Sequence, residues 1–186
     1  MKTVALFAKS GTILFLIAAL GCQNQPSDKH LQMEADQAQL EANLELYKDI
    51  WDEIINGRKI ELINADSFDE NVTALATADG DIVGIENFKA YYNNYLTGFS
   101  DAEFTIVDAF GQGNKIVKHW NFKGTHDGEF FGVPATGKTV DISGTTLVEM
   151  KDGKIAKEQD FFDVTQMLNK LTTGDVNADA ANPGVL

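Results

Sequence analysis

Residues 124–163 read GTHDGEFFGVPATGKTVDISGTTLVEMKDGKIAKEQDFFD, and this stretch decides the fold. A loop rich in glycine and proline precedes the run 139–150, in which apolar and polar residues alternate as they do in a strand. Asp152 and Gly153 then give a strong hairpin signal before a last strand-like run, 154–162. The stretch therefore predicts an antiparallel pair of strands entered from a long, tightly turned loop.

Upstream residues extend this pattern in two ways. Period-two alternation recurs over 104–110 and 115–125, so two more strands precede the loop. Farther upstream, helical spacing of apolar residues predominates. The other predicted elements are a helix over 32–55, a short helix over 58–63, an extended run over 71–77, a turn at Asp79-Gly80, a helix over 84–96 and a last helix over 164–171. Helices followed by consecutive antiparallel strands predict an α+β domain, in which N-terminal helices cover a cone-shaped, curved antiparallel sheet. A small molecule would enter at the open end of the cone.

Two motifs carry a resemblance to a known family. The loop GTHDGEFFGVPATGK (124–138), followed one strand later by DGKI and DFFD (152–163), resembles the signature of the SnoaL-like polyketide cyclases. This family lies within the nuclear-transport-factor-2-like superfamily, whose single fold carries cyclases, isomerases, dehydratases and binding modules. The resemblance implies a conical pocket and a homodimer formed through the outer face of the sheet.

The same resemblance implies a role for Asp160, which matches the family's catalytic aspartate. That residue removes a proton alpha to a carbonyl and then assists ring closure by aldol addition. The cyclases pair it with a histidine on the preceding strand, but this chain has Thr145, Thr146, Leu147, Val148 and Glu149 there. Two readings therefore stay open: a cyclase-like or isomerase-like enzyme with a carboxylate base, and a non-catalytic lipoprotein that binds a ligand or partner.

The residues themselves point to the same strand. Glu158 and Asp160 lie two positions apart, so they share one face at a separation of roughly 7 Å. Strict alternation places Ile155 on the opposite face. Burial and mutual repulsion would raise a carboxyl pKa toward the range useful for a general base. Asp160, with Glu158 beside it, is the preferred base, although either carboxylate could instead pair with Lys118 or Lys157.

Other side chains could complete such a site. His126, in the loop, could donate to a substrate oxygen or bond the loop backbone. Aromatic residues could form the walls of a pocket for a small, hydrophobic carbonyl compound, or they could simply pack the core. The aromatic candidates are Tyr91, Tyr95, Trp120, Phe122, Phe130 and Phe162. We expect no cofactor and no metal, because histidines at ligand spacing and a converging acidic triplet are both lacking in the sequence.

The N-terminus has the features of a bacterial lipoprotein signal. Two lysines, an apolar run and Cys22, the single cysteine, predict cleavage after residue 21 and lipidation of Cys22. The expected organisation is a signal peptide (1–21), a lipidated tether (22–31), the domain (32–171) and a disordered tail (172–186). The domain would then lie in the cell envelope, outside the cytoplasm. The formal net charge of −13 excludes nucleic-acid binding. Attachment of the protein to the membrane would therefore depend on the lipid alone.

Overall fold

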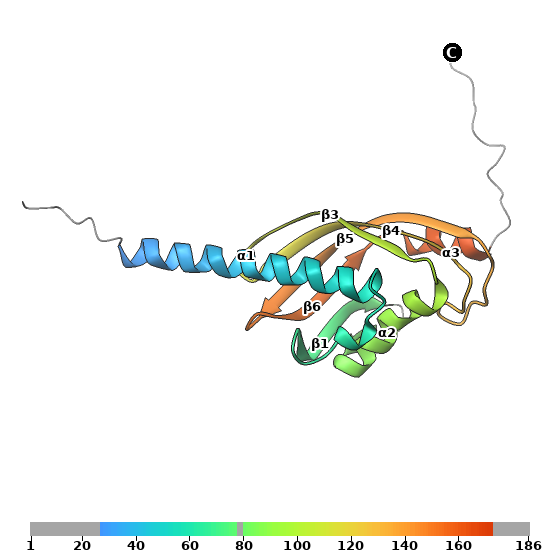
Figure 1. Ribbon diagram of the computed structural model, residues 1–186, viewed down its shortest axis with the longest axis horizontal. Helices are drawn as coiled ribbons and strands as arrows, with labels where there is room; N and C mark the ends of the chain where they lie inside the picture. Colours follow the sequence, from blue (N-terminus) through green and yellow to red (C-terminus); the bar gives the residue numbers. More distant parts are fainter. Residues whose placement is uncertain (1–26, 78–79, 173–186) are drawn as a thin grey trace, which may run out of the picture.

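The computed structural model describes residues 27–77 and 80–172 of this chain. Helices and strands there combine into one α+β domain around a single sheet, as the sequence predicts (Figure 1). The elements are α1 (Asp28–Ile55), η1 (Ile60–Leu62), β1 (Phe68–Thr77), β2 (Gly80–Val83), α2 (Ile85–Gly98), β3 (Glu103–Gln112), β4 (Lys115–Thr125), β5 (Thr139–Lys151), β6 (Lys154–Phe161) and α3 (Val164–Thr172).

The strand order in the sheet is β2-β1-β6-β5-β4-β3. Strands β3 to β6 pair with their sequence neighbours in antiparallel fashion, and so do β1 and β2. The exception to the antiparallel arrangement is β1, which runs parallel to β6. A parallel pair requires a long crossover, and here the intervening α2, β3, β4 and β5 supply it.

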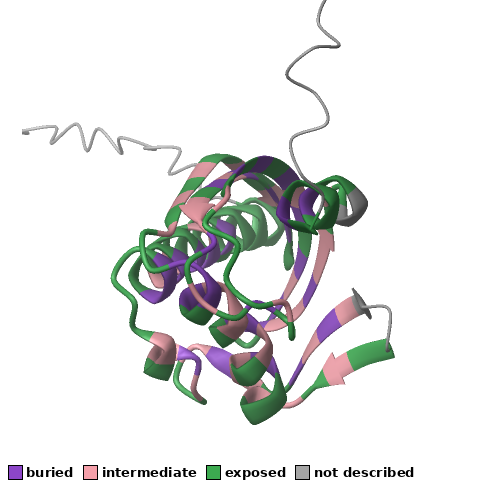
Figure 2. Cartoon of the chain, turned by 90° about the vertical axis from the view of Figure 1, so that its right-hand side faces the viewer, coloured by how far each residue is buried: buried purple, intermediate pink, exposed green. Residues whose placement is uncertain are grey.

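The sheet curves around the helices, and its concave face carries the core. Figure 1 shows α1 and α2 against that face, with α1 extending beyond the sheet at its N-terminal end. In the end-on view of Figure 2, buried segments face the interior between sheet and helices. Strand β5 shows the reason, because its even-numbered residues from Val140 to Met150 are buried while most of its odd-numbered ones are exposed.

Several boundaries differ from the sequence prediction. Helix α1 begins at Asp28, capped by Ser27, whose side chain accepts a hydrogen bond from the His30 amide, so residues 28–31 of the expected tether are helical. The short helix expected over 58–63 is a single 3₁₀ turn, and β2 was not predicted. The signal peptide, Cys22, Asp79 and the tail beyond residue 172 lie outside the described residues.

Strand β6 contains a β-bulge that places its carboxylates. Met150 pairs with Ile155, but the preceding Glu149 pairs with Lys157, so Ala156 is an extra residue on β6. The strict alternation assumed from the sequence was therefore wrong at Ile155. Ile155 and Glu158 are both buried on the concave side.

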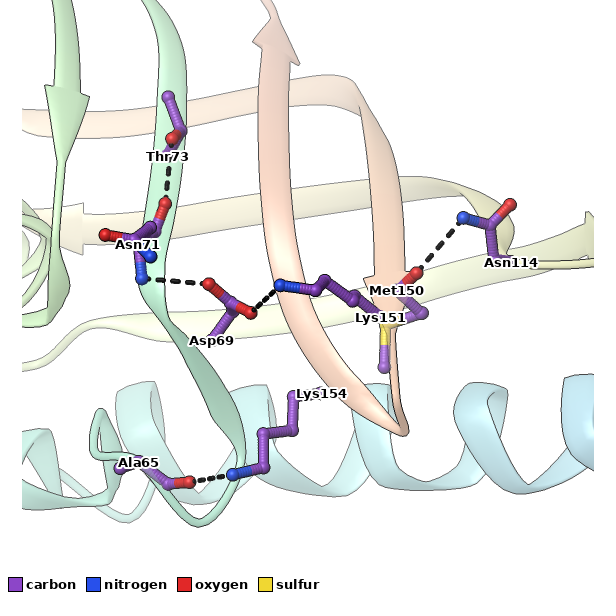
Figure 3. A network of polar contacts seen from close by, with 8 residues as sticks. All are labelled: Ala65, Asp69, Asn71, Thr73, Asn114, Met150, Lys151 and Lys154. Carbon is purple, nitrogen blue, oxygen red and sulfur yellow. Dashed lines mark hydrogen bonds and ion pairs between the residues drawn. The ribbon is translucent and has the colours of Figure 1, made fainter.

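Polar contacts pin the β5–β6 hairpin in place (Figure 3). Lys151 donates to Asp69 of β1 at 2.8 Å, and Lys154 donates to the carbonyl of Ala65. On the other side, Asn114 and Met150 exchange two hydrogen bonds of 2.7 and 3.1 Å. The hairpin is thus fastened to β1 and to the β3–β4 turn, which steadies the strand that carries Asp160.

Gly144 on β5 allows Trp120 to lie flat across the sheet. A Cβ at position 144 would sit 2.4 Å from Cζ2 of the indole, which leaves no room for a side chain. We expect Gly144→Ala to lower the free energy of unfolding by about 1–3 kcal/mol, the usual effect of overpacking a core. Urea denaturation measures this, with exposed Ser143→Ala on the same strand as control. Equal stability of the two variants would contradict the packing argument.

None of the helices within residues 27–77 and 80–172 combines the length and apolar character that a membrane-crossing segment needs.

Candidate functional site

A cavity lies between the concave face of the sheet and helices α1 and α2. Its volume is about 40 Å³, above the roughly 10–15 Å³ that a cavity needs to hold a water molecule. Aromatic and aliphatic side chains form most of its wall, with Lys118 and Asp160 as the charged members. The lining residues are Trp51, Ile55, Tyr92, Tyr95, Phe104, Lys118, Trp120, Phe122, Ile142, Asp160 and Phe162.

Asp160 is half-buried and held by two hydroxyl groups. Thr146, directly opposite on β5, donates a hydrogen bond to Oδ1. The hydroxyl of Tyr92 lies 3.1 Å from Oδ2. Thr146 in turn accepts a hydrogen bond of 2.9 Å from Nε1 of Trp120. A threonine therefore occupies the place on the preceding strand where the family resemblance led us to look for a histidine.

Glu158 has a different environment although it shares the strand face. It is fully buried and does not line the cavity. Its Oε1 accepts hydrogen bonds from the Tyr47 hydroxyl at 2.6 Å and from Nε1 of Trp51 at 2.9 Å. Burial raises the pKa of Glu158, the charge of Lys118 opposes this shift, and Asp160 reinforces it. Glu158 thus organises aromatic side chains of α1 from beneath the cavity.

Tyr92 joins the two carboxyl groups. Its hydroxyl oxygen is 2.9 Å from Oε2 of Glu158 and 3.1 Å from Oδ2 of Asp160, but it has one proton to donate. Burial, with both carboxyl charges adding to it, raises the pKa of Tyr92 well above its usual value, so the hydroxyl stays protonated. The raised pKa of Glu158 favours its protonated form. In that form the acid can donate to Tyr92 while Tyr92 donates to Asp160, an arrangement that would satisfy every polar atom of the three groups.

Lys118 is a functional candidate that the sequence prediction did not include among the site residues. It is buried, and its Nζ lies 4.8 to 5.2 Å from the ring centroids of Trp51, Tyr47 and Phe104. Among the described residues it makes no ion pair with either carboxylate, whereas Lys157 pairs with Glu149 at 3.8 Å. The sequence contained a signal for this, because Lys118 lies on the same face of β4 as the apolar residues that pack in the core.

The other predicted site residues divide between the cavity and the surrounding core. Tyr95, Trp120, Phe122 and Phe162 line the cavity together with Asp160. Tyr91 does not, because its ring packs against Tyr92 and Phe131 with centroid distances of 5.1 and 5.2 Å.

Phe130 also lies outside the cavity wall. It is buried, and its ring contacts those of Tyr95 and Phe99 at centroid distances of 5.1 and 5.2 Å. The turn after it explains this placement, because Phe131 and Gly132 both adopt positive φ and reverse the chain at once. Phe130 and Val133 then close the turn with two backbone hydrogen bonds.

His126 is fully buried and does not line the cavity. Its ring lies beside that of Phe99, with centroids 5.5 Å apart, and Nδ1 is 3.0 Å from Oγ1 of Thr136. Nε2 has no hydrogen-bond partner among the described residues. The backbone carbonyl accepts from the amides of Thr136 and Gly137. The main chain of His126 thus bonds the loop backbone, and its ring packs in the core instead of lining the cavity.

No group of three or more histidine, cysteine, aspartate or glutamate side chains that could hold a metal ion occurs in the described part of the chain.

The family model for SnoaL-like polyketide cyclases matches residues 44–171, which include every cavity residue named above. The chain belongs to this family. No curated protein matches the chain.

Several solved structures have a fold similar to that of this SnoaL-like protein. A candidate SnoaL-like polyketide cyclase from Jannaschia sp. CCS1 is 21% identical, with a TM-score of 0.66, and the match covers 72% of this chain and 94% of that one. TsrD from Streptomyces laurentii is 20% identical, with a TM-score of 0.60 and coverage of 73% and 96%. IdmH, a candidate polyketide cyclase from Streptomyces antibioticus, is 19% identical, with a TM-score of 0.57 and coverage of 69% and 97%. At these identities the likeness establishes the fold.

Proposed function

We propose that this SnoaL-like protein binds a small, mostly apolar carbonyl compound and removes a proton alpha to the carbonyl, with Asp160 as general base. Cyclisation, isomerisation and related lyase reactions all begin with this step, and it needs no cofactor. The observation that carries the proposal is the position of Asp160, the one carboxylate among the residues that line the apolar cavity.

The surroundings of Asp160 suit proton transfer. Thr146 and Tyr92 fix its carboxylate from two sides, so it does not have to reorient during the reaction. Apolar side chains make up most of the cavity wall beside Asp160. A positioned base of this kind contributes about 10²–10⁴-fold to the rate. Glu158, beneath the cavity, would hold Tyr92 in place rather than contact the ligand.

The cavity limits which part of a ligand it can enclose. A volume of about 40 Å³ is well below the roughly 300–1,000 Å³ of a typical ligand pocket. The cavity can therefore enclose only a small group of a ligand, such as the carbonyl. The remainder of a larger ligand would therefore lie outside the cavity, or aromatic side chains such as Phe104 and Phe162 would move.

Deuterium exchange tests the proposal without knowledge of the natural substrate. Small ketones and 1,3-dicarbonyl compounds are incubated with the protein in deuterated buffer, and loss of the alpha-proton signal is followed by NMR. We expect faster exchange with wild-type protein than with Asp160→Asn. Equal rates for both proteins across the whole panel would overturn the assignment of Asp160.

The second candidate function is non-catalytic binding of a ligand or partner. Thr146, in place of the family's histidine, favours it, because a threonine hydroxyl is not a general acid near neutral pH. Native mass spectrometry of the purified protein separates the two functions. A retained carbonyl ligand that shows no alpha exchange would support the binding protein.

We also propose that the mature protein is anchored through a lipid on Cys22, with the domain outside the cytoplasm. The order of basic residues, apolar run and cysteine supports this. In the native host, Cys22→Ala is expected to move the protein from the membrane fraction to the soluble fraction. Intact mass would show loss of the acyl chains. A variant that stays in the membrane fraction would contradict the proposal.

A homodimer formed through the outer face of the sheet is a further proposal. Large apolar side chains are exposed on β3, β5 and β6, at Val107, Phe110, Leu147 and Phe161. Burying such a patch would stabilise a dimer. Sedimentation velocity over a range of concentrations tests it, and a monomer at every concentration would reject it.

A further inference from the structure

The ammonium group of Lys118 lies in the cavity and has no hydrogen-bond acceptor among the described residues. Lys118 is only 4% exposed and lines the cavity beside Trp51 and Phe104. Its contacts within residues 27–77 and 80–172 are with ring faces and, at longer range, with the carboxyl group of Glu158. An ammonium group has three N–H donors. A buried charge whose donors are unused is costly, so a ligand oxygen there would be strongly favoured.

The rings beneath Lys118 fix the position of its charge. The face of Trp51 lies 4.8 Å from Nζ and that of Tyr47 lies 4.9 Å away. The Tyr47 hydroxyl and the Trp51 indole N–H both donate hydrogen bonds to Oε1 of Glu158. Glu158 therefore orients the rings, and the rings hold Nζ by cation–π attraction without consuming its hydrogen bonds. The cation is thus positioned in advance, as electrostatic stabilisation of a transition state requires.

We propose that Lys118 binds the ligand oxygen on which negative charge develops, so that the cavity selects ligands able to form an enolate. This inference rests on the proposed role of Asp160 for the direction of proton transfer. Lys118 on β4 and Asp160 on β6 line the same cavity, which has room for a carbonyl and its neighbouring carbon. One charged group would contact the oxygen and the other would face the alpha carbon.

The step balances without a co-reactant. The carboxylate of Asp160 takes the alpha proton, and the electron pair of the broken C–H bond forms a carbon–carbon double bond. The carbonyl π pair moves to oxygen, which becomes an enolate hydrogen-bonded to Nζ of Lys118. Asp160 then holds the proton and can return it to carbon. Lys118 stays an ammonium group throughout and forms no covalent bond.

A stable 1,3-diketone provides a test that does not need turnover. The enol and the enolate of 2,4-pentanedione differ in ultraviolet absorption, so the enolate fraction can be measured directly at fixed pH. We expect wild-type protein to increase that fraction. Lys118→Met keeps an unbranched side chain that is one heavy atom shorter and removes the charge, and should bind the enolate at least about tenfold more weakly. Lys118→Arg, which keeps the charge, should retain part of the binding.

Asp160→Asn separates this inference from the proposed function. Binding of a preformed enolate does not need the base, so this variant should still bind the enolate even though it has lost deuterium exchange. Binding that depends on Lys118 in a protein that catalyses no exchange would support this inference and reject the proposed function.

Three outcomes would overturn the inference. The first is no increase of the enolate fraction with wild-type protein, a measurement that holds even if Lys118→Met fails to fold. The second is equal enolate binding by wild type and a folded Lys118→Met. The third is a covalent adduct on Lys118 after borohydride treatment with the probe, because that result would make the lysine a nucleophile that forms an imine.

Discussion

Asp160→Asn is expected to slow deuterium exchange at the alpha carbon of a responsive ketone by about 10²–10⁴-fold, the usual contribution of a positioned base. Asparagine has the shape of aspartate but cannot act as a base near neutral pH. Its side-chain oxygen can still accept from Thr146, and its amide can donate to Tyr92, whose hydroxyl then donates to Glu158. The fold should therefore persist while the chemistry is lost.

Asp163→Asn is the matched control for this variant. Asp163 is exposed, and its Oδ1 accepts a hydrogen bond of 2.7 Å from the amide of Gln166 at the start of α3. Asparagine caps helices about as well as aspartate does. This control should therefore exchange at the wild-type rate. The deuterium-exchange rates of both variants are measured by NMR at one pH. If the exchange rate fell equally in the two variants, the cause would be a general effect of charge.

Glu158→Leu is expected to lower the free energy of unfolding by about 2–6 kcal/mol, because each of two buried donors left without an acceptor costs roughly 1–3 kcal/mol. The donors concerned are the hydroxyl of Tyr47 and the indole N–H of Trp51, whereas Tyr92 can still donate to Asp160. This is a large part of the roughly 5–15 kcal/mol that stabilises a typical domain. Chemical denaturation at fixed pH measures the change.

Glu158→Gln is the control, because glutamine reproduces the protonated acid. Its oxygen can accept from Tyr47 and Trp51, and its amide can donate to Tyr92, which then donates to Asp160. This variant should stay close to wild type at low pH. If Glu158→Leu were as stable as Glu158→Gln, the hydrogen bonds from Tyr47 and Trp51 would contribute nothing to folding.

The raised pKa of Glu158 gives this pair a pH dependence. The native protein binds the proton more tightly than the unfolded chain does. The contribution of Glu158 to stability is therefore fully present below its unfolded pKa of about 4.3 and is lost as the pH rises through the folded pKa. Over this pH range, the free energy of unfolding of Glu158→Gln should rise relative to that of wild type. The opposite trend would show that Lys118 holds Glu158 as an anion.

Local sequence determined most of the secondary structure. The period-two runs over 104–110, 115–125 and 139–150 became β3, β4 and β5, because alternate side chains of a strand must face opposite sides of the sheet. The dipeptide at Asp152 and Gly153 formed the expected hairpin, with both residues at positive φ. These features depend on residues close together in the chain, so a sequence contains the information for them.

The candidate site was predictable in part. Asp160 and four of the six aromatic candidates line one cavity, since each follows from a strand or helix face. The different surroundings of Glu158 and Asp160 were not predictable. They depend on Tyr47 and Trp51, which lie more than 100 positions earlier in the chain.

By itself, then, the sequence determined the strands, the hairpin and the acidic face that carries Asp160, because each is set by the geometry of a few consecutive residues. Only the tertiary structure decided that β1 pairs in parallel with β6, that His126 is buried beside Phe99, and that Lys118 projects into an aromatic cavity. These outcomes result from contacts between distant segments. Such contacts form only when the whole core closes, since burial and charge are properties of the assembled fold.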